Sequence, residues 1–292
     1  MNNYSSKLLF IINPFSGNKT IDWAMEIRNY YTASLHLFEL FHLTEQCSLL
    51  TLKERIKLFS PDIVIAVGGD GTIKLLAECL IKTNIPLGFL PAGSANGLAK
   101  ELGISNEPKQ ALNQLMNGNP RKIHLTKINE HLCIHLSDIG LNAFAMQKFK
   151  TIPGRGMRGY FLAILQVLFQ NPVLEIKIIS GKKIVKTNAY MVVIANATQF
   201  GTGAIINPIG SLFDELFEVI LIKKISILEL FKMRFSHANF DREKTEVIQT
   251  KVISISSRKK VHFQIDGEYL GKVNEINAEI IPQALQIIFP NV

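Results

Sequence analysis

The strongest constraint on the fold is the stretch SPDIVIAVGGDGTIKLLAECL, residues 60–80. It begins with a short, β-branched apolar run, which is typical of a strand buried on both faces. The run leads directly into the turn GGDGT, residues 68–72, and the apolar spacing that follows predicts a helix. Three glycines around one aspartate indicate that another group approaches this backbone closely, with a carboxylate held beside it.

The first part of the chain alternates between strand and helix patterns. Short apolar runs predict strands at 7–12, 35–41, 62–67 and 86–91, and amphipathic spacing predicts helices at 20–33, 47–59, 72–82, 94–102 (with Ser94 as N-cap) and 108–117. Such alternation predicts a parallel sheet with helices on both faces.

After residue 122 strand patterns dominate. They are expected at 131–137, 174–180, 184–196, 217–223, 249–256, 261–265 and 276–289, with helices near 159–170 and 226–234. The sequence therefore predicts an α/β plus all-β protein. A three-layer α/β nucleotide-binding domain (1–122) would precede a two-layer β-sandwich domain for the substrate (123–280), and 281–292 would return to the first domain.

Composition limits the classes of function. The 292 residues include 47% hydrophobic and 19% charged residues, which is ordinary for a globular protein. No apolar run approaches the ~20 residues of a membrane-spanning helix, and MNNYSSKLLFIINP lacks the features of a signal peptide, so we expect a cytoplasmic protein. The three cysteines, Cys47, Cys79 and Cys133, are expected to be buried thiols. A net charge of +8 favours an anionic partner.

Three glycine-containing turns follow strands of the first domain: NPFSGN (13–18), GGDGT (68–72) and PAGSAN (91–96). In a parallel sheet the carboxyl ends of the strands share one edge, where ligands bind and helix N-termini favour anions. The P-loop pattern and the dinucleotide fingerprint G-x-G-x-x-G are both missing. A carboxylate repels bare phosphate, so Asp70 implies either a magnesium ion between them or a hydroxyl to accept.

GGDGT followed by LPAGSANGLAKELG resembles the diacylglycerol kinase catalytic domain family, which includes bacterial lipid kinases and sphingosine kinases. NPFSG (13–17), the segment 190–221, QIDGE (264–268) and IIPQALQIIF (280–289) are similar to further motifs of that family. The resemblance implies an ATP- and Mg²⁺-dependent kinase that transfers the γ-phosphate to a lipid hydroxyl, with diacylglycerol as the default acceptor and phosphatidic acid as the product.

The resemblance also implies residue roles. Glu268 would be the base that accepts the lipid hydroxyl proton, and Asp70 would belong to the acidic network around the catalytic magnesium. A structural magnesium would match Asp214 with backbone oxygens of Ser211 and Leu216. The ATP site would be lined by Asn13, Pro14, Phe15, Ser16, Gly17, Thr44, Gly68, Gly69, Asp70, Gly71, Thr72, Ile73, Lys74, Leu75, Gly93, Ser94 and Asn96.

Some positions depart from the family pattern. Leu75 stands where the family usually has glutamate, and Glu215 replaces the glycine of the motif D-G-x-L-D. Glutamate destabilises a left-handed backbone if the turn requires one, which weakens the case for the structural magnesium site. Lys74 either contacts a phosphate or faces solvent.

The family implies a peripheral enzyme that meets its lipid at an anionic membrane surface. The loop PGRGMRG, with Arg155 and Arg158, is the expected contact. Nucleic acid is not expected, because no clustered basic and aromatic face accompanies the net charge; a homodimer stays open. Two alternatives are an NAD kinase, although no G-S-T-A-Y-like motif is found, and a degenerate nucleotide-binding protein without catalysis.

Overall fold

The computed structural model describes residues 6–17, 20–32, 34–152, 157–170, 172–198, 205–225 and 244–291. The chain forms two compact units. Unit 1 comprises Met1–His124 and Pro282–Val292, and unit 2 comprises Leu125–Ile281. The chain passes between the units within two strands, β5 (Asn119–Ile128) and β14 (Glu268–Phe289). The sequence boundaries at 122 and 280 therefore fall inside continuous strands rather than in linkers.

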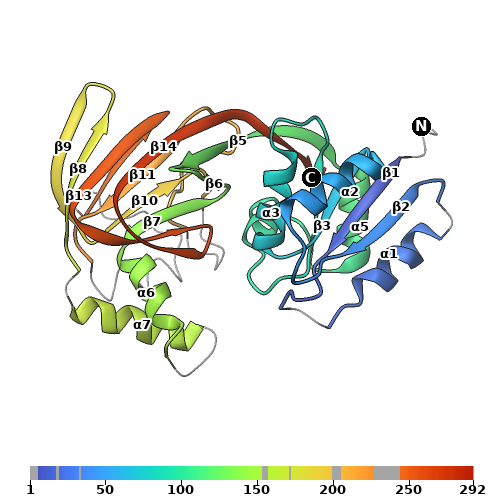
Figure 1. Ribbon diagram of the computed structural model, residues 1–292, viewed down its shortest axis with the longest axis horizontal. Coiled ribbons are helices and arrows are strands. Elements are labelled where there is room, and N and C mark those ends of the chain that lie inside the picture. The colour runs from blue at the N-terminus through green and yellow to red at the C-terminus, as the bar shows by residue number, and fades with distance from the viewer. Residues whose placement is uncertain are drawn as a thin grey trace. The chain divides into compact units, whose positions relative to one another are not determined.

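Unit 1 is a three-layer α/β domain built on a parallel sheet (Figure 1). The strand order is β4 (Leu87–Pro91), β3 (Ile63–Gly68), β1 (Lys7–Ile12) and β2 (Leu37–His42), and the end of β14 pairs in parallel with β4. The central strands are buried on both faces, as their apolar runs predict.

Helices cover the two faces of this sheet in pairs. Helix α1 (Trp23–Tyr31) contacts α5 (Pro108–Asn117), and α2 (Leu49–Phe59) contacts α3 (Asp70–Leu80). The short helix α4 (Gly97–Glu101) follows β4. Side chains of α1 and α5 share one core with β1, β3 and β4.

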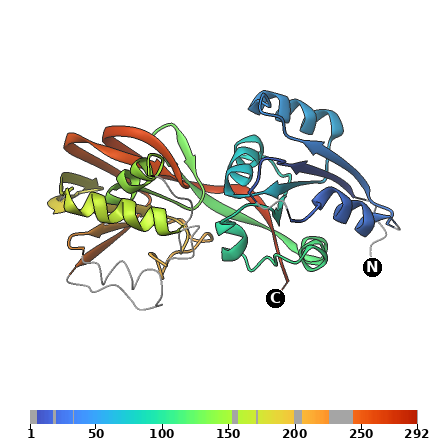
Figure 2. The same ribbon diagram turned by 90° about the horizontal axis from the view of Figure 1, so that it is seen from below.

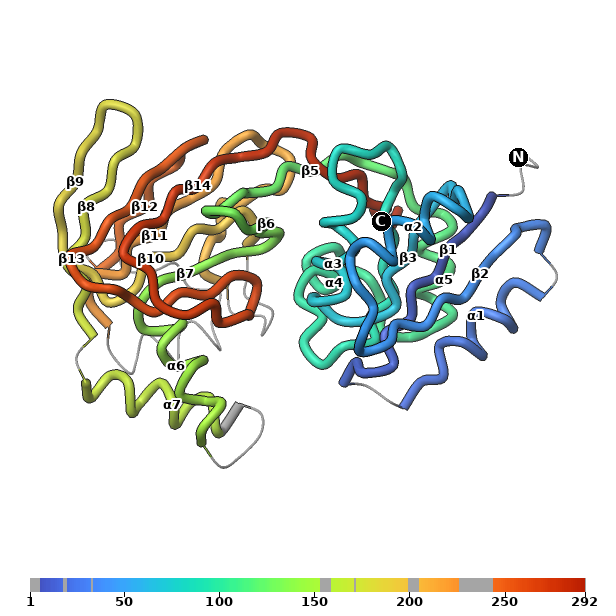
Figure 3. Tube along the Cα trace, viewed as in Figure 1, coloured from blue at the N-terminus to red at the C-terminus, as the bar shows by residue number. Residues whose placement is uncertain are grey.

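Unit 2 is a β-sandwich-like domain of antiparallel strands. Its main order is β12 (Thr245–Thr250), β11 (Phe217–Ile222), β10 (Met191–Ala195), β7 (Leu136–Gly140), β13 (Val252–Ile265) and the first part of β14. The hairpin of β8 (Leu174–Ser180) and β9 (Lys183–Ala189) pairs with β13, and the short β6 (His131–Cys133) pairs with β5 (Figure 3).

Two cores lie on opposite faces of the central strands of unit 2. In β10, Val192 and Ile194 belong to the core shared with β8, β13 and β14. Met191 and Val193 instead pack with α6 (Leu141–Phe149) and α7 (Met157–Phe169). In Figure 2, helix α7 runs across the side of unit 2 that is turned toward the viewer. This double burial explains why β10 is a continuous apolar run instead of an alternating one.

Several local expectations require correction. Helix α4 begins at Gly97 with Asn96 as N-cap, and not at Ser94. Strand β5 and helix α6 were not expected, and the expected strand 184–196 is divided into β9 and β10. The expected helix near 226–234 lies outside the described residues. Within the described part of the chain, no helix is long and apolar enough to cross a membrane.

Candidate active site

The three glycine-containing turns of unit 1 lie at the carboxyl ends of adjacent parallel strands. NPFSG follows β1, GGDGT follows β3 and PAGSAN follows β4, and these strands neighbour one another in the order β4-β3-β1. Backbone bonds join the turns: Asn13 N–H donates to the Val67 carbonyl at 2.9 Å, and Ala92 N–H donates to the Gly68 carbonyl at 2.9 Å. The sheet therefore brings together turns that lie far apart in the sequence, at 13–18, 68–72 and 91–96.

Most of the glycines in these turns are required by contacts within the protein. A Cβ on Gly93 would collide with the backbone of Gly69, and a Cβ on Gly68 would collide with the side chain of Thr72. Gly71 differs, because among the described residues, apart from its chain neighbours and the backbone of α3 itself, no atom lies within 4 Å of the place where its Cβ would be. Gly71 is also exposed at the first turn of α3. Open space beside the start of a helix allows a phosphate to approach the backbone amides.

Asn13 and Thr72 link two of the turns directly. The Asn13 Nδ2 group donates to Thr72 Oγ1 at 2.9 Å, and Asn13 Oδ1 accepts from the amide of Phe15 at 3.0 Å. Thr72 is buried, whereas Phe15 is 59% exposed. The polar side chains of Asn13 and Thr72 therefore shape the loop, and the exposed segment that follows Asn13 is left to contact a ligand.

Asp70 has a structural task that the sequence did not indicate. Its Oδ2 accepts from the amide of Gly97 at 2.9 Å, and its Oδ1 accepts from the amide of Leu98 at 3.0 Å. A carboxylate in this position satisfies N–H groups at the start of α4 and favours its dipole. Asp70 thus holds the PAGSAN turn to the GGDGT turn, and the magnesium role implied by the resemblance stays a prediction.

The other predicted nucleotide residues divide by exposure. Asn96 is turned inward: its Oδ1 accepts from Gly93 N–H and its Nδ2 donates to the Gly93 carbonyl, both at 2.8 Å. Ile73 belongs to the core at 3% exposure, so its side chain is not available to a ligand. The exposed or half-buried positions are Pro14, Ser16, Gly17, Thr44, Gly69, Lys74, Leu75 and Ser94.

In unit 2, Glu268 begins β14 directly after a two-residue hairpin turn. Ile265 pairs with Glu268 across the turn, and the two residues between them, Asp266 and Gly267, have φ angles of 49° and 84°. Two positive φ angles in an Asp-Gly loop are typical of a type I′ turn, which matches the twist of the paired strands. Glu268 is exposed. The Asp and Gly of the DGE motif therefore form the hairpin turn, and the turn places the Glu268 carboxylate at the start of β14.

The hairpin is anchored to the segment before β7. Asp266 accepts from the amides of Ile134 at 3.0 Å, His135 at 2.9 Å and Leu136 at 3.3 Å. Its own amide donates to the Leu136 carbonyl at 2.9 Å. Asp266 therefore fixes the turn and is not free to act on a substrate.

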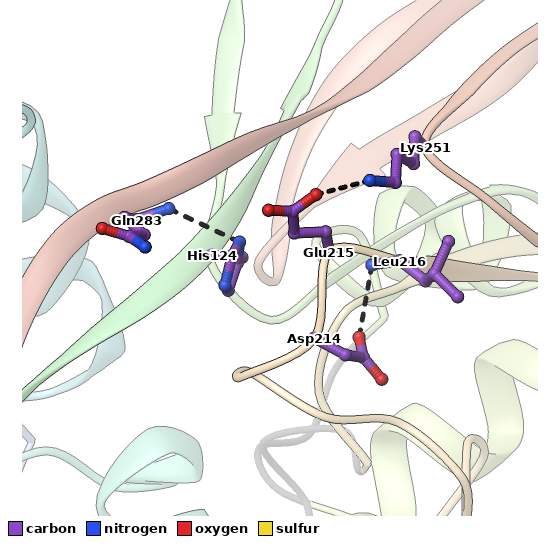
Figure 4. Close-up of polar contacts among 6 residues, drawn as sticks. All are labelled: His124, Asp214, Glu215, Leu216, Lys251 and Gln283. Carbon is purple, nitrogen blue, oxygen red and sulfur yellow. Dashed lines mark hydrogen bonds and ion pairs between the residues drawn. The ribbon is translucent and has the colours of Figure 1, made fainter.

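The proposed structural metal ligands Ser211, Asp214 and Leu216 lie in one loop before β11, and Figure 4 shows Asp214 and Leu216. Asp214 Oδ1 accepts from the amide of Leu216 at 3.3 Å, and Ser211 Oγ accepts from the amide of Phe213 at 3.1 Å. Glu215, which replaces the family glycine, forms an ion pair with Lys251. Among the described residues there is no group of three or more His, Cys, Asp or Glu side chains that could hold a metal ion. The expected structural site uses one carboxylate and two backbone oxygens, which is a different donor set, so the magnesium site at Asp214, Ser211 and Leu216 stays a prediction.

Sequence reasoning missed a buried polar network beside the hairpin. Asp138 in β7 and Gln264 in β13 are each 1% exposed, and Gln264 Nε2 donates to Asp138 Oδ2 at 2.5 Å. Asp138 also accepts from the Asn142 side chain and, at 2.9 Å, from the amide of Ala143. Burial raises the pKa of the Asp138 carboxyl to about 6, although these hydrogen bonds lower it. In the sequence, the one indication of this network is an aspartate inside an apolar strand, LSDIG.

Comparison with known proteins agrees with this geometry. Residues 7–128 match the profile of the diacylglycerol kinase catalytic domain. Residues 138–289 match the YegS C-terminal NAD kinase beta sandwich-like domain. The chain belongs to the diacylglycerol kinase catalytic domain family. The sequence resemblance is thereby confirmed, and the two matched regions correspond to the α/β and β-sandwich-like architectures.

Relatives of this diacylglycerol kinase family protein are distant. The diacylglycerol kinase of Bacillus subtilis (strain 168) is 27% identical over 224 residues, which cover 72% of each chain. The diacylglycerol kinase of Staphylococcus aureus (strain Newman) is 26% identical over 260 residues, which cover 85% of this chain and 81% of the relative. A crystal structure of a diacylglycerol kinase from Bacillus anthracis str. Sterne has a TM-score of 0.73, covers 97% of both chains and is 17% identical, which shows the common fold.

Proposed function

We propose that this chain is an ATP- and Mg²⁺-dependent lipid kinase that transfers the γ-phosphate of ATP to a lipid hydroxyl, with diacylglycerol as acceptor and phosphatidic acid as product. The observation that carries the proposal is the open backbone at Gly71. It lies at a helix start, on a sheet edge where three glycine-containing turns meet. The names of the relatives supply the lipid class.

Positioning and charge neutralisation account for most of the catalysis of phosphoryl transfer. The amides at the start of α3 would hold the phosphates of the nucleotide, because the first amides of a helix have no partner within it. The exposed NPFSG turn would add further contacts to the nucleotide. Magnesium, when bound with the nucleotide, supplies neutralisation of the phosphate charge. Asp70 contributes by keeping the PAGSAN and GGDGT turns together.

Glu268 would serve as the base. A hydroxyl is a weak nucleophile at neutral pH, so a carboxylate that accepts its proton late in the transfer assists the step. The exposed position of Glu268 at the end of a rigid type I′ turn supports this role, because the turn presents the side chain without folding it into the core.

The test is a radiolabelled ATP assay with purified protein and mixed micelles that contain diacylglycerol, phosphatidylglycerol, a sphingoid base or no lipid. Glu268→Gln should lower kcat by ~10²-fold or more and leave ATP affinity unchanged. Glu279→Gln is the matched control, because Glu279 is an exposed carboxylate farther along the same strand. Equal loss of kcat in both variants, or loss of ATP binding without loss of kcat, would contradict the assignment of the base.

The same assay, run with NAD as an additional acceptor, separates the alternatives. Transfer of label to NAD in place of every lipid would indicate an NAD kinase. ATP binding without transfer to any acceptor would indicate a nucleotide-binding protein that is not a catalyst.

The proposal includes a peripheral membrane location, because the lipid acceptor is almost insoluble in water. The segment expected to contact an anionic bilayer contains Arg155 and Arg158; Arg158 was expected in a loop but lies in the first turn of α7. Arg155 lies outside the described residues, and of Arg158 only the backbone is described. The proposed membrane role of Arg155 and Arg158 therefore rests on the sequence.

A further inference from the structure

We propose that Gln264 is a positioning residue for Glu268, and that the buried Asp138 carboxylate sets the orientation in which Gln264 works. This inference rests on the proposed role of Glu268 as the base. It extends that role to two buried side chains, one in β7 and one in β13, which do not themselves reach a substrate.

Gln264 makes a direct hydrogen bond to the hairpin turn. Gln264 Oε1 accepts from the amide of Gly267 at 2.9 Å. Gly267 immediately precedes Glu268 and has a φ of 84°. A two-residue hairpin leaves this amide outside the ladder of the paired strands, so the glutamine side chain provides a bond that the turn alone lacks. That bond restrains the peptide from which Glu268 projects.

The contact with Asp138 determines which way the Gln264 side-chain amide points. Its Nε2 group donates to Asp138 Oδ2 at 2.5 Å. An ionised carboxylate only accepts hydrogen bonds, so it binds the NH2 end of the amide and directs the oxygen toward Gly267. A neutral hydroxyl or a water molecule in the place of Asp138 would accept either orientation.

Asp138 is in turn held in place by α6 and α7. Asn142 and the amide of Ala143, both in α6, also donate to its carboxylate. The Tyr160 hydroxyl, from α7, donates to Asn142 Oδ1. The two helices that cover this face of the sheet therefore fix the carboxylate, and the carboxylate fixes the glutamine.

The arrangement is costly if it serves stability alone. A buried carboxylate without a cation beside it loses solvation that hydrogen bonds replace only in part. An apolar pair at these two positions would satisfy the packing of the core without that cost. The hydrogen bond from Gly267 to Gln264 connects this network to the turn that carries the base, so a role in positioning the base accounts for its place in the fold.

The first test compares Gln264→Leu with Gln249→Leu in the lipid kinase assay. Gln249 is a matched control, because its Nε2 donates to the buried Glu218 at 2.9 Å in the same unit but is not bonded to the hairpin turn. Gln264→Leu should lower kcat on the order of 10²-fold, the loss expected when a reacting group is misplaced by about 1 Å. The KM for ATP should not change, and Gln249→Leu should retain the wild-type kcat.

A second measurement does not depend on activity. Amide exchange, followed by NMR, should be roughly tenfold faster at Gly267 in Gln264→Leu than in the wild type or in Gln249→Leu, as expected for one lost hydrogen bond. If Gln264→Leu does not fold, Gln264→Asn replaces it, because its side chain is one methylene too short to reach both Asp138 and Gly267.

The outcomes separate this inference from the proposed function. If the wild type is active and Gln264→Leu retains its kcat, the inference is wrong and the proposed function stands. If no lipid is phosphorylated by the wild type, the proposed function is wrong and the catalytic part of the inference falls with it. Unchanged exchange at Gly267 would overturn the inference in either case.

Discussion

Replacing Asp138 with asparagine removes an ionisable group from the interior of unit 2 and preserves its shape. The side chain is 1% exposed, and among the described residues the hydrogen bonds that it accepts come from neutral N–H groups. Burial raises the pKa of this carboxyl from 3.8 to about 6. Because asparagine does not titrate, the difference in stability between variant and wild type as a function of pH isolates the ionisation of this one side chain.

The sign of the effect follows from proton binding. Between pH 3.8 and about 6 the folded protein keeps a proton on Asp138 that the unfolded chain has released, so wild-type stability falls as the pH rises. At about 1.4 kcal/mol per pKa unit, the total is ~3 kcal/mol. The free energy of unfolding of Asp138→Asn, relative to wild type, should therefore rise by up to ~3 kcal/mol between about pH 4 and pH 7 and then level off.

His262 acts in the opposite direction within the same window. Burial, together with Lys272 and Lys148, lowers the pKa of its imidazole from 6.5 to about 4. The stability due to neutral His262 is therefore lost as the pH falls through this range, which masks the Asp138 effect in the wild type alone. Both proteins carry His262, so its contribution cancels in the difference between them.

Calorimetry at a series of pH values measures this difference. The single tryptophan, Trp23, lies in unit 1, so its fluorescence reports the unfolding of that unit. A second unfolding transition without a change in tryptophan fluorescence is then assigned to unit 2. Glu175→Gln serves as control, because Glu175 is an exposed carboxylate of β8. The reasoning would be refuted if the free energy of unfolding of Asp138→Asn, relative to wild type, were constant with pH or fell as the pH rises.

Three further predictions concern the glycine turns and the membrane loop. Asp70→Asn should abolish lipid kinase turnover. It should also lower the free energy of unfolding of unit 1 by ~1 kcal/mol, because one hydrogen bond from the carboxylate to the start of α4 is lost. Tryptophan fluorescence during urea unfolding measures this free energy. Gly71→Ala should leave the free energy of unfolding of unit 1 within ~0.5 kcal/mol of wild type and raise the KM for ATP. Gly93→Ala should lower the free energy of unfolding by ~1–3 kcal/mol, because the added Cβ collides with the backbone of the GGDGT turn. Arg155→Glu/Arg158→Glu should weaken sedimentation with anionic vesicles, most clearly at low salt, and leave the KM for ATP unchanged, since each basic residue contributes about 1 kcal/mol near such a surface.

Each of these predictions has a clear contrary result. Wild-type turnover in folded Asp70→Asn would remove Asp70 from the site. An unchanged KM for ATP in Gly71→Ala would move the phosphates away from the start of α3. Equal sedimentation of the double arginine variant and the wild type would remove the loop from the membrane contact.

Local pattern was sufficient for the architecture of unit 1. The apolar runs that became β1, β3 and β4 and the amphipathic spacings of α2 and α5 are signals carried by neighbouring residues, so the α/β class follows from them. Parallel pairing then places the turns after these strands on one edge, whatever the details of packing. The Asp-Gly turn before Glu268 is equally local, because two positive φ angles favour those two residue types.

The tertiary structure alone decided what single polar side chains do. Asp70 bonds amides 27 and 28 residues farther along the chain, and Gln264 bonds Asp138 across 126 residues. One aspartate in an apolar strand has no periodicity that names its partner, since the partner is chosen by strand order and register. Burial then changes the chemistry of that side chain, because a carboxyl that would ionise near pH 4 in water keeps its proton to about pH 6 when α6, α7 and β13 exclude the solvent.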